Sequence, residues 1–296
     1  MNKAKHWLLA AGFSLCAANP IIAQDSEQES TAVSTSTDPL SAAIASRPEA
    51  DQARDIYRHP AQTLEFFQVE PGMTVAEALP GRGWYTKILA NYLGADGTLY
   101  GVNYVERMWP LFSFMDEEAV AKRIASTKAF PGMVRGFTDN GIAAAGFTFS
   151  SVPAKAIGKV DRVLMIRALH NLNRFEEQAG THSQALAAVR SLLTADGLVG
   201  VVQHRLPESA SDASADGSRG YLKQSAVIAM FEDAGFALVD SSEINANPKD
   251  KPDADDIVWR LLPSLSGSKS DPEKRAAMEA IGESDRMTLL FKKSSD

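Results

Sequence analysis

Short apolar runs alternate with longer amphipathic stretches along the chain from about residue 51 to residue 292. The run at residues 160–166 is nearly continuous, which is typical of a parallel strand buried on both faces. The pattern predicts strands that begin near Val75 and at residues 98–102, 147–150, 160–166, 198–202, 236–244 and 287–292. It predicts helices at residues 51–67, 85–93, 115–129, 184–193 and 224–234, where apolar side chains recur on one helix face.

The order of these elements predicts the fold class. Strands that alternate with helices imply a parallel sheet, because each helix carries the chain back to start the next strand. Residues 287–292 alternate between apolar and polar and would pair antiparallel at the sheet edge. We therefore expect an α/β fold, with a mostly parallel seven-stranded sheet, an antiparallel edge strand and helices on both faces.

The first 23 residues have the features of an export signal. Two lysines precede a short apolar run at residues 7–18, and the small residue Ala23 stands at the cleavage position. Residues 19 and 20, Asn-Pro, break the apolar run, which argues against a membrane-spanning anchor. We expect residues 1–23 to be removed and the mature protein to be periplasmic, without stable insertion in the membrane. Residues 24–45 are rich in Ser and Thr, which predicts a disordered linker before a domain at residues 46–296.

Cysteine content and charge exclude several classes of protein. The one cysteine, Cys16, lies inside the export signal, and the bulky Leu15 before it argues against a lipoprotein. The mature chain then has no disulfide and no thiolate nucleophile. Removal of two lysines with the signal takes the formal net charge from −7 to −9, which argues against a nucleic-acid partner. No pair of histidines has the spacing of metal ligands, so we expect no metal.

A Gly-x-Gly turn follows the first predicted strand, in the segment Glu77-Ala-Leu-Pro-Gly-Arg-Gly83. Glycines in this position let the backbone approach a ligand closely, and the next helix points its amides at it. A carboxylate at Glu77 would repel a pyrophosphate but attract a cationic group, such as the ammonium or sulfonium of S-adenosylmethionine (SAM). We expect Glu77, Gly81 and Gly83 to hold the methionine part of SAM. A tight turn without a ligand is the structural alternative.

Polar side chains follow several other predicted strands, at the edge of the sheet where α/β proteins bind their ligands. Asn103 would accept a hydrogen bond from the ribose, with Glu106 as a substitute. His170 is a candidate general base, because its neutral imidazole can accept a proton from an acceptor hydroxyl or amine. His204 and Arg205 follow the next strand, where an arginine fork can hold a carboxylate or phosphate. Residues 209–220, rich in Ser, Ala, Asp and Gly, would form a lid beside them.

Longer sequence motifs, together with these residues, are similar to those of a known protein family. The chain resembles an exported proteobacterial family of predicted class I SAM-dependent methyltransferases. The matching segments are residues 54–60, 63–66, 80–86, 167–171, 200–205, 220–221, 242–250 and 282–289. The resemblance implies a Rossmann-like methyltransferase fold and roles for His170, His204, Arg205 and Tyr221 at the catalytic site. The chain departs from the family at Leu79, Asn103 and Leu172, which puts the affinity for SAM in question more than the fold.

Three functions are consistent with these features. The first is SAM-dependent methyl transfer to a small-molecule acceptor. The second is a lyase, isomerase or hydrolase that keeps the fold and uses His170, His204 and Asp285 without SAM. The third is a non-catalytic protein in which the lid closes on a small anion held by Arg205.

Overall fold

The computed structural model describes residues 38–294. The expected export signal, its cleavage site and residues 24–37 of the expected linker lie outside the described residues. Residues 38–45, which we expected to belong to the linker, form helix α1 (Pro39–Ala45) instead. The Asp38 carboxylate caps this helix by accepting a hydrogen bond from the Ser41 amide, and Leu40 and Ala43 are buried. The ordered chain therefore begins before residue 46.

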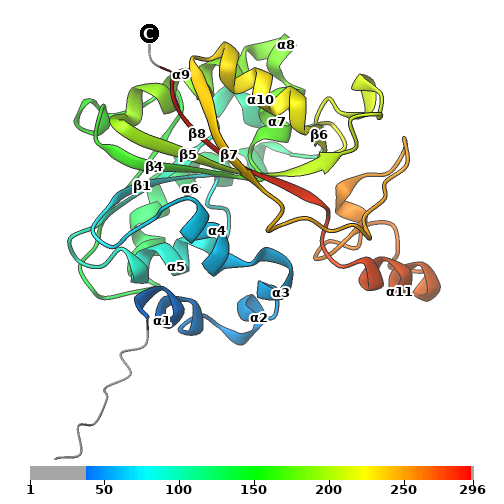
Figure 1. The fold of residues 1–296 in the computed structure, drawn as a ribbon, viewed down its shortest axis with the longest axis horizontal. Coiled ribbons are helices and arrows are strands. Elements are labelled where there is room, and N and C mark those ends of the chain that lie inside the picture. Colours follow the sequence, from blue (N-terminus) through cyan, green and yellow to red (C-terminus); the bar gives the residue numbers. More distant parts are fainter. Residues whose placement is uncertain (1–37, 295–296) are drawn as a thin grey trace, which may run out of the picture. The chain divides into compact units, whose positions relative to one another are not determined.

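A mostly parallel sheet forms the centre of the fold (Figure 1). Its strands are β1 (Thr74–Ala78), β2 (Thr98–Asn103), β3 (Ala143–Thr148), β4 (Val160–Ile166), β5 (Leu193–Leu206), β6 (Leu222–Lys223), β7 (Phe236–Ser242) and β8 (Arg286–Lys293). Their order is β3-β2-β1-β4-β5-β8-β7, and the two-residue β6 pairs with β5 outside this path. The strands β1 to β5 run parallel, whereas β8 runs antiparallel to both β5 and β7. The expected α/β, Rossmann-like fold is confirmed, and the antiparallel last strand lies one position in from the edge.

Helices cover both faces of the sheet (Figure 1). Helices α1, α4, α5 and α6 pack on one face through a core that includes Leu64, Phe67, Ile88 and Phe130. Helices α9 and α10 pack on the other face. The remaining bounds are α2 (Glu49–Gln52), α3 (Asp55–Arg58), α4 (Pro60–Phe66), α5 (Trp84–Tyr92), α6 (Glu117–Arg135), α7 (Leu169–Arg174), α8 (Glu176–Ala179), α9 (Thr181–Leu192), α10 (Gln224–Asp233) and α11 (Pro272–Ile281). Short 3₁₀ turns are η1 (Glu106–Leu111), η2 (Ala154–Ala156), η3 (Asp212–Ser214) and η4 (Val258–Arg260).

The prediction of a single helix at residues 51–67 is wrong, because the structure divides this segment into α2, α3 and α4. His59 has a left-handed backbone, with φ of 40°, and Pro60 begins α4. A residue before proline is disfavoured in the right-handed helical region, so the chain turns here. The turn fixes the direction in which Arg54 and Arg58 point into the molecule.

Within residues 38–294, no helix combines the length and apolar character needed to cross a bilayer.

Candidate functional site

A cavity of about 640 Å³ lies at the carboxyl ends of β1, β2 and β4. Its walls are largely aromatic and apolar, with a few polar groups between them, as is typical of small-molecule sites. It is lined by Leu79, Pro80, Gly81, Asn103, Tyr104, Trp109, Phe112, Phe114, Met115, Arg123, Ser126, Ala129, Phe130, Met133, His170, Asn171, Arg174 and Trp259. Three of the expected site residues, Gly81, Asn103 and His170, therefore share one cavity.

The loop between β1 and α5 forms one rim of this cavity. Leu79, Gly81 and Gly83 all have left-handed backbones, with φ of 52°, 59° and 79°. Leu79 and Gly81 line the cavity, whereas Gly83 is the residue before α5. A Cβ at Gly83 would lie 2.6 Å from the Phe137 ring, so glycine is needed here both for its conformation and for the space. Gly83 shapes the loop and does not line the cavity.

Glu77 lies beneath this loop and does not line the cavity. Its side chain is 5% exposed, and its carboxylate accepts a hydrogen bond of 2.6 Å from the Thr86 hydroxyl of α5. Burial raises the pKa of Glu77 to about 7, although the Thr86 hydrogen bond and the charge of Arg167 oppose that rise. Glu77 therefore joins the end of β1 to the start of α5 and carries an ionisable proton near neutral pH.

Asn103 reaches the cavity from the end of β2. Its amide nitrogen donates a hydrogen bond of 2.8 Å to the Thr127 hydroxyl of α6. In the described part of the chain, no group donates to its carbonyl oxygen, which leaves that oxygen able to accept a hydrogen bond from a ligand. Glu106, the expected substitute, is exposed in η1 and does not line the cavity.

His170 lies in the first turn of α7, directly after β4. Its Nδ1 is 3.3 Å from the Gln203 side-chain oxygen, which also accepts from the His170 backbone amide at 3.3 Å. Burial is the main cause that lowers the pKa of His170 to about 4; the Gln203 hydrogen bond opposes this shift, and the charge of Arg167 adds to it. The imidazole is therefore neutral at physiological pH, and the Gln203 oxygen favours a proton on Nδ1.

The other three candidate catalytic residues lie away from the cavity. The His204 ring is 5.7 Å from that of His170, but its Nδ1 is 2.6 Å from the Ser284 hydroxyl. Burial is the main cause that lowers the pKa of His204 well below its usual value, so this ring is also neutral. The Tyr221 ring lies 6.2 Å from the His204 ring, so these side chains form a layer behind the cavity wall.

The polar partners of Arg205 and Tyr221 explain why neither faces the cavity. Arg205 binds the carboxylates of Asp285 and Glu243 with all three guanidinium nitrogens. The Tyr221 hydroxyl donates to Asp250 at 3.2 Å and accepts from Arg260 at 3.0 Å. Arg205 therefore ties β5 to the segments at Glu243 and Asp285. Tyr221, directly before β6, ties that strand to the segments at Asp250 and Arg260.

The expected lid is packed against α7. The Asn173 side chain donates to the Asp216 carbonyl at 2.9 Å, and Ser214 and Ala215 are buried. A Cβ at Gly217 would lie 2.0 Å from the His170 carbonyl, so the loop approaches the α7 backbone directly. In this conformation residues 209–220 buttress α7.

The aromatic wall of the cavity was not predicted. Trp109, Phe112, Phe114 and Met115 come from η1 and the segment after it, and Trp259 comes from η4. Phe114 is 75% exposed, which is unusual for a large apolar side chain. The run of three aromatic residues at 109–114 without helical or strand spacing was the signal that could have identified this wall.

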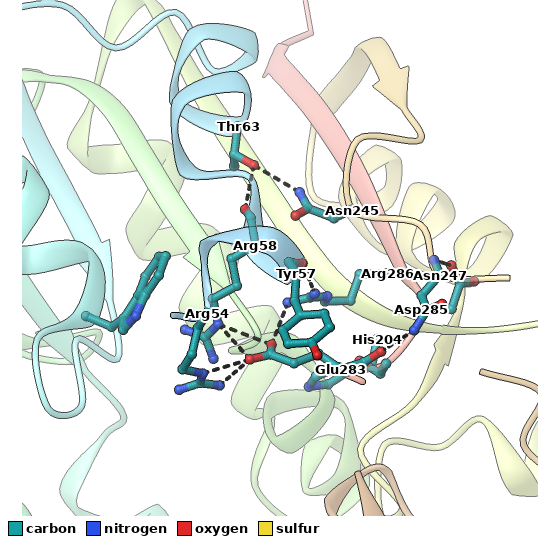
Figure 2. Close-up of polar contacts among 12 residues, drawn as sticks. Arg54, Tyr57, Arg58, Thr63, His204, Asn245, Asn247, Glu283, Asp285 and Arg286 are labelled. Carbon is teal, nitrogen blue, oxygen red and sulfur yellow. Dashed lines mark hydrogen bonds and ion pairs between the residues drawn. The ribbon is translucent and has the colours of Figure 1, made fainter. Parts of the chain in front are cut away.

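A second feature missed from the sequence is a buried group of arginines around Glu283 (Figure 2). Glu283 accepts hydrogen bonds from Arg54, Arg58 and Arg286, and the Arg286 guanidinium also donates to the Tyr57 carbonyl. Nearby, Asn245 joins Thr63 to Thr288 through two hydrogen bonds of 3.0 Å. The network connects α3 and α4 to the start of β8, although these segments are far apart in the sequence.

Among residues 38–294, no group of three or more His, Cys, Asp or Glu side chains is arranged to hold a metal ion.

Comparisons with known proteins show similarity of fold at low sequence identity. No family model matches the chain, and no curated protein matches it. The structure is similar to that of the [4+2]-cyclase SpnF, with a TM-score of 0.49, 12% identity and 81% of each chain covered. It is also similar to a complex between the Haloferax volcanii Trm112 methyltransferase activator and a putative methyltransferase, with a TM-score of 0.48, 16% identity, and 87% of this chain and 97% of that chain covered. A third similar structure is the Burkholderia thailandensis 1,6-didemethyltoxoflavin-N1-methyltransferase with bound 1,6-didemethyltoxoflavin and S-adenosylhomocysteine. Its TM-score is 0.44 at 12% identity, and the match covers 83% of this chain and 82% of that chain.

Proposed function

We propose that this protein is a SAM-dependent methyltransferase that acts on a small-molecule acceptor. The observation that carries the proposal is the position of the cavity. In the sheet order β3-β2-β1-β4-β5, the direction of winding reverses between β1 and β4, and the cavity lies at the carboxyl ends of these two strands and β2. Open α/β sheets bind nucleotide-like ligands at this point.

The residues of the cavity fit the parts of SAM. The left-handed turn at Leu79 and Gly81 brings backbone to the cavity rim, where it can approach the methionine part. The free carbonyl oxygen of Asn103 can accept a hydrogen bond from a ribose hydroxyl. The aromatic wall offers faces on which a purine can stack. Glu77 supports the loop through Thr86 and places a carboxylate beneath the site of a cationic group.

The same cavity can hold an acceptor beside His170. SAM, when bound, supplies the methyl group, and the transfer requires that the acceptor atom be aligned with it and that water be excluded. The apolar walls exclude water, and the neutral His170 ring can orient an acceptor hydroxyl or amine or take its proton. His204 stands behind His170 and acts as a positioning residue in this proposal.

The alternative functions require other side chains to reach the cavity. A SAM-independent enzyme would use His204 and Asp285, but His204 is engaged by Ser284 and Asp285 by Arg205. A binding protein based on Arg205 would need free guanidinium donors, which Asp285 and Glu243 already occupy. The cavity, its loop and Asn103 therefore favour methyl transfer over both.

Calorimetric titration of the protein with SAM and with S-adenosylhomocysteine tests the proposal. Asn103→Ala should weaken binding about fivefold to tenfold, because one hydrogen bond is worth about 1 kcal/mol. Asn91→Ala is the control, since Asn91 is partly buried and, like Asn103, donates a side-chain hydrogen bond, here to the Lys87 carbonyl on α5, away from the cavity. The proposal fails if neither nucleoside binds at high micromolar concentration, or if the two variants lose affinity equally.

We also propose that the protein acts in the periplasm after removal of residues 1–23. The lysines, apolar run and Ala23 of this segment support the proposal. N-terminal sequencing of the protein from a periplasmic fraction should give Gln24 as the first residue. An intact Met1, or recovery only from the cytoplasm, would contradict it.

A further inference from the structure

Four arginines from three separate segments gather around the carboxylate of Glu283, outside the lining of the candidate cavity. Arg54 and Arg58 come from the α3 region, Arg167 follows β4 directly, and Arg286 begins β8. Glu283 accepts hydrogen bonds from three of them, as Figure 2 shows. Arg167 is close enough to Arg58 and Glu283 for their charges to interact. We call this set the arginine cluster.

The arginine cluster has more positive than negative charge. Burial, and then the nearby Arg167, lower the pKa of Arg58 to about 9, and burial lowers that of Arg167 to about 10, so both remain charged at neutral pH. Glu283 is ionised, because the guanidiniums outweigh the effect of burial and lower its pKa. Glu77 is the other carboxyl that interacts with Arg167, and it is only partly ionised near pH 7. Four arginines face one ionised and one partly ionised carboxyl, which leaves an excess of two to three positive charges; Arg54, 24% exposed, is partly screened by solvent. A buried charge without a counter-ion is costly, so this excess destabilises the free protein.

Several donors in the cluster also lack an acceptor. Both terminal nitrogens of Arg58, Nε of Arg167 and Nε of Arg286 are buried without a hydrogen-bond partner among residues 38–294. Arg58 itself is 2% exposed, and its guanidinium stacks on the Trp84 ring at 4.6 Å. No group in the described chain accepts a hydrogen bond from any nitrogen of the Arg167 side chain. Buried donors of this kind are rare in folded proteins and call for a partner.

We propose that the arginine cluster binds a carboxylate of the protein's ligand, with Arg58 and Arg167 as the groups that bind it. An added carboxylate would accept hydrogen bonds from the unpartnered donors and reduce the excess positive charge. A carboxylate suits the planar guanidinium fork, and Glu283 shows that the cluster already holds one such group. The proposal does not depend on methyl transfer, because any ligand with a carboxylate would meet the same donors.

The cluster is placed to act together with the cavity. Arg167 precedes His170 by three positions in the segment after β4, and its charge affects both His170 and Glu77. None of the four arginines lines the cavity, whereas His170 does. A carboxylate that binds Arg167 would therefore extend from the cavity past His170 to the arginine cluster. Two sources are chemically suitable: the amino-acid end of SAM and a carboxylate on the methyl acceptor.

Thermal unfolding in sodium acetate and in sodium chloride, at equal pH and ionic strength, tests whether the site exists. Acetate at ten times its Kd should raise the Tm of the wild-type protein by about 3 °C over chloride. Arg167→Gln should lose this rise and should be at least as stable as the wild type in chloride, because it removes one of the positive charges that the cluster holds in excess. A structural arginine would behave in the opposite way, since its loss would lower the Tm and leave the acetate effect.

Arg162→Gln is the matched control, on the strand that Arg167 directly follows. Arg162 lies near the start of β4, at the other end of the strand, and donates to the carbonyls of Phe67, Gln68 and Asp161. Its replacement should lower the Tm and retain the acetate effect. The proposal is overturned if acetate and chloride act alike on the wild type, if Arg167→Gln keeps the acetate effect, or if Arg167→Gln fails to fold.

Binding of two nucleosides identifies the source of the carboxylate. S-adenosylhomocysteine carries the amino-acid carboxylate, and 5′-methylthioadenosine lacks it. If the cluster holds that carboxylate, Arg167→Gln should weaken S-adenosylhomocysteine about tenfold and leave methylthioadenosine unchanged. If each nucleoside binds the variant as tightly as the wild type, an acetate effect that the wild type shows and Arg167→Gln loses assigns the site to a carboxylate of the acceptor. If neither nucleoside binds, the proposed methyl transfer fails, whereas the acetate experiment still decides the arginine cluster.

Discussion

Replacement of Glu77 by Gln should change how the stability of the protein depends on pH. Gln has the shape of Glu and its side-chain oxygen can still accept the hydrogen bond from Thr86. The change therefore removes the ionisable proton and little else. Glu77 is 5% exposed, so its charge is not screened by solvent.

The magnitude follows from the pKa of Glu77, which burial raises from 4.5 to about 7. In the folded protein the carboxyl holds its proton more tightly than in the unfolded chain. The contribution of the Glu77 carboxyl to the free energy of unfolding is therefore fully present below pH 4.5, and it is lost as the pH rises through 7. The difference between the two pKa values corresponds to about 3 kcal/mol. From pH 4.5 to pH 8, the free energy of unfolding of Glu77→Gln should gain about 3 kcal/mol relative to that of the wild type.

Urea unfolding at a series of pH values measures both proteins. All other titrating groups are common to the two proteins, so the difference between the curves isolates Glu77. The reasoning is refuted if the two curves run parallel, or if the difference grows toward acid pH. In the proposed function the same variant should bind SAM more weakly, because it loses the carboxylate beneath the cationic group; a gain in stability at pH 8 would then accompany a loss of affinity.

Three further predictions concern single side chains. Glu283→Gln should lower the free energy of unfolding by about 3–5 kcal/mol, because it leaves the buried arginines without their carboxylate; a urea midpoint close to that of the wild type would contradict this. Gly83→Ala should destabilise the protein by about 2 kcal/mol or more, since φ is 79° and the new Cβ would meet the Phe137 ring at 2.6 Å; denaturant unfolding measures the loss, and an unchanged midpoint would show that the loop relaxes. The His170 ring should show no titration near pH 6.5 by NMR, because burial lowers its pKa to about 4; a midpoint above 6 would mean that the ring is solvated.

The strands and most helices could be predicted because they depend on local pattern. The apolar run at residues 160–166 is a buried strand in the structure, at the bounds expected from the sequence. Residues 98–102 and 224–234 also match their elements within one residue. The helix expected at residues 51–67 failed because apolar spacing continues across His59-Pro60, whereas the backbone cannot remain helical there.

The site was predicted only where it follows strand ends. Gly81, Asn103 and His170 come directly after β1, β2 and β4, so the topology of the sheet brings them to one cavity. Most of the aromatic wall comes from the 3₁₀ turn η1, which contains Pro110, and from the segment after it, where no helical or strand period reveals which side chains share a face. Arg205 was expected at the site because it follows a predicted strand, and Tyr221 because of the family resemblance, but their carboxylate and guanidinium partners come from distant loops that the sequence does not connect to them.

The arginine cluster also makes the packing of α3 depend on a residue near the other end of the domain. Arg54 and Arg58 are synthesised early, but their carboxylate at Glu283 is made only after every strand except β8. Until then, burial of these cations would be opposed by their own repulsion. A nascent or clipped polypeptide that ends before residue 283 lacks this carboxylate, so packing of α3 against Trp84 would bury Arg58 without its counter-ion. Stable packing of α3 therefore requires the segment that carries Glu283.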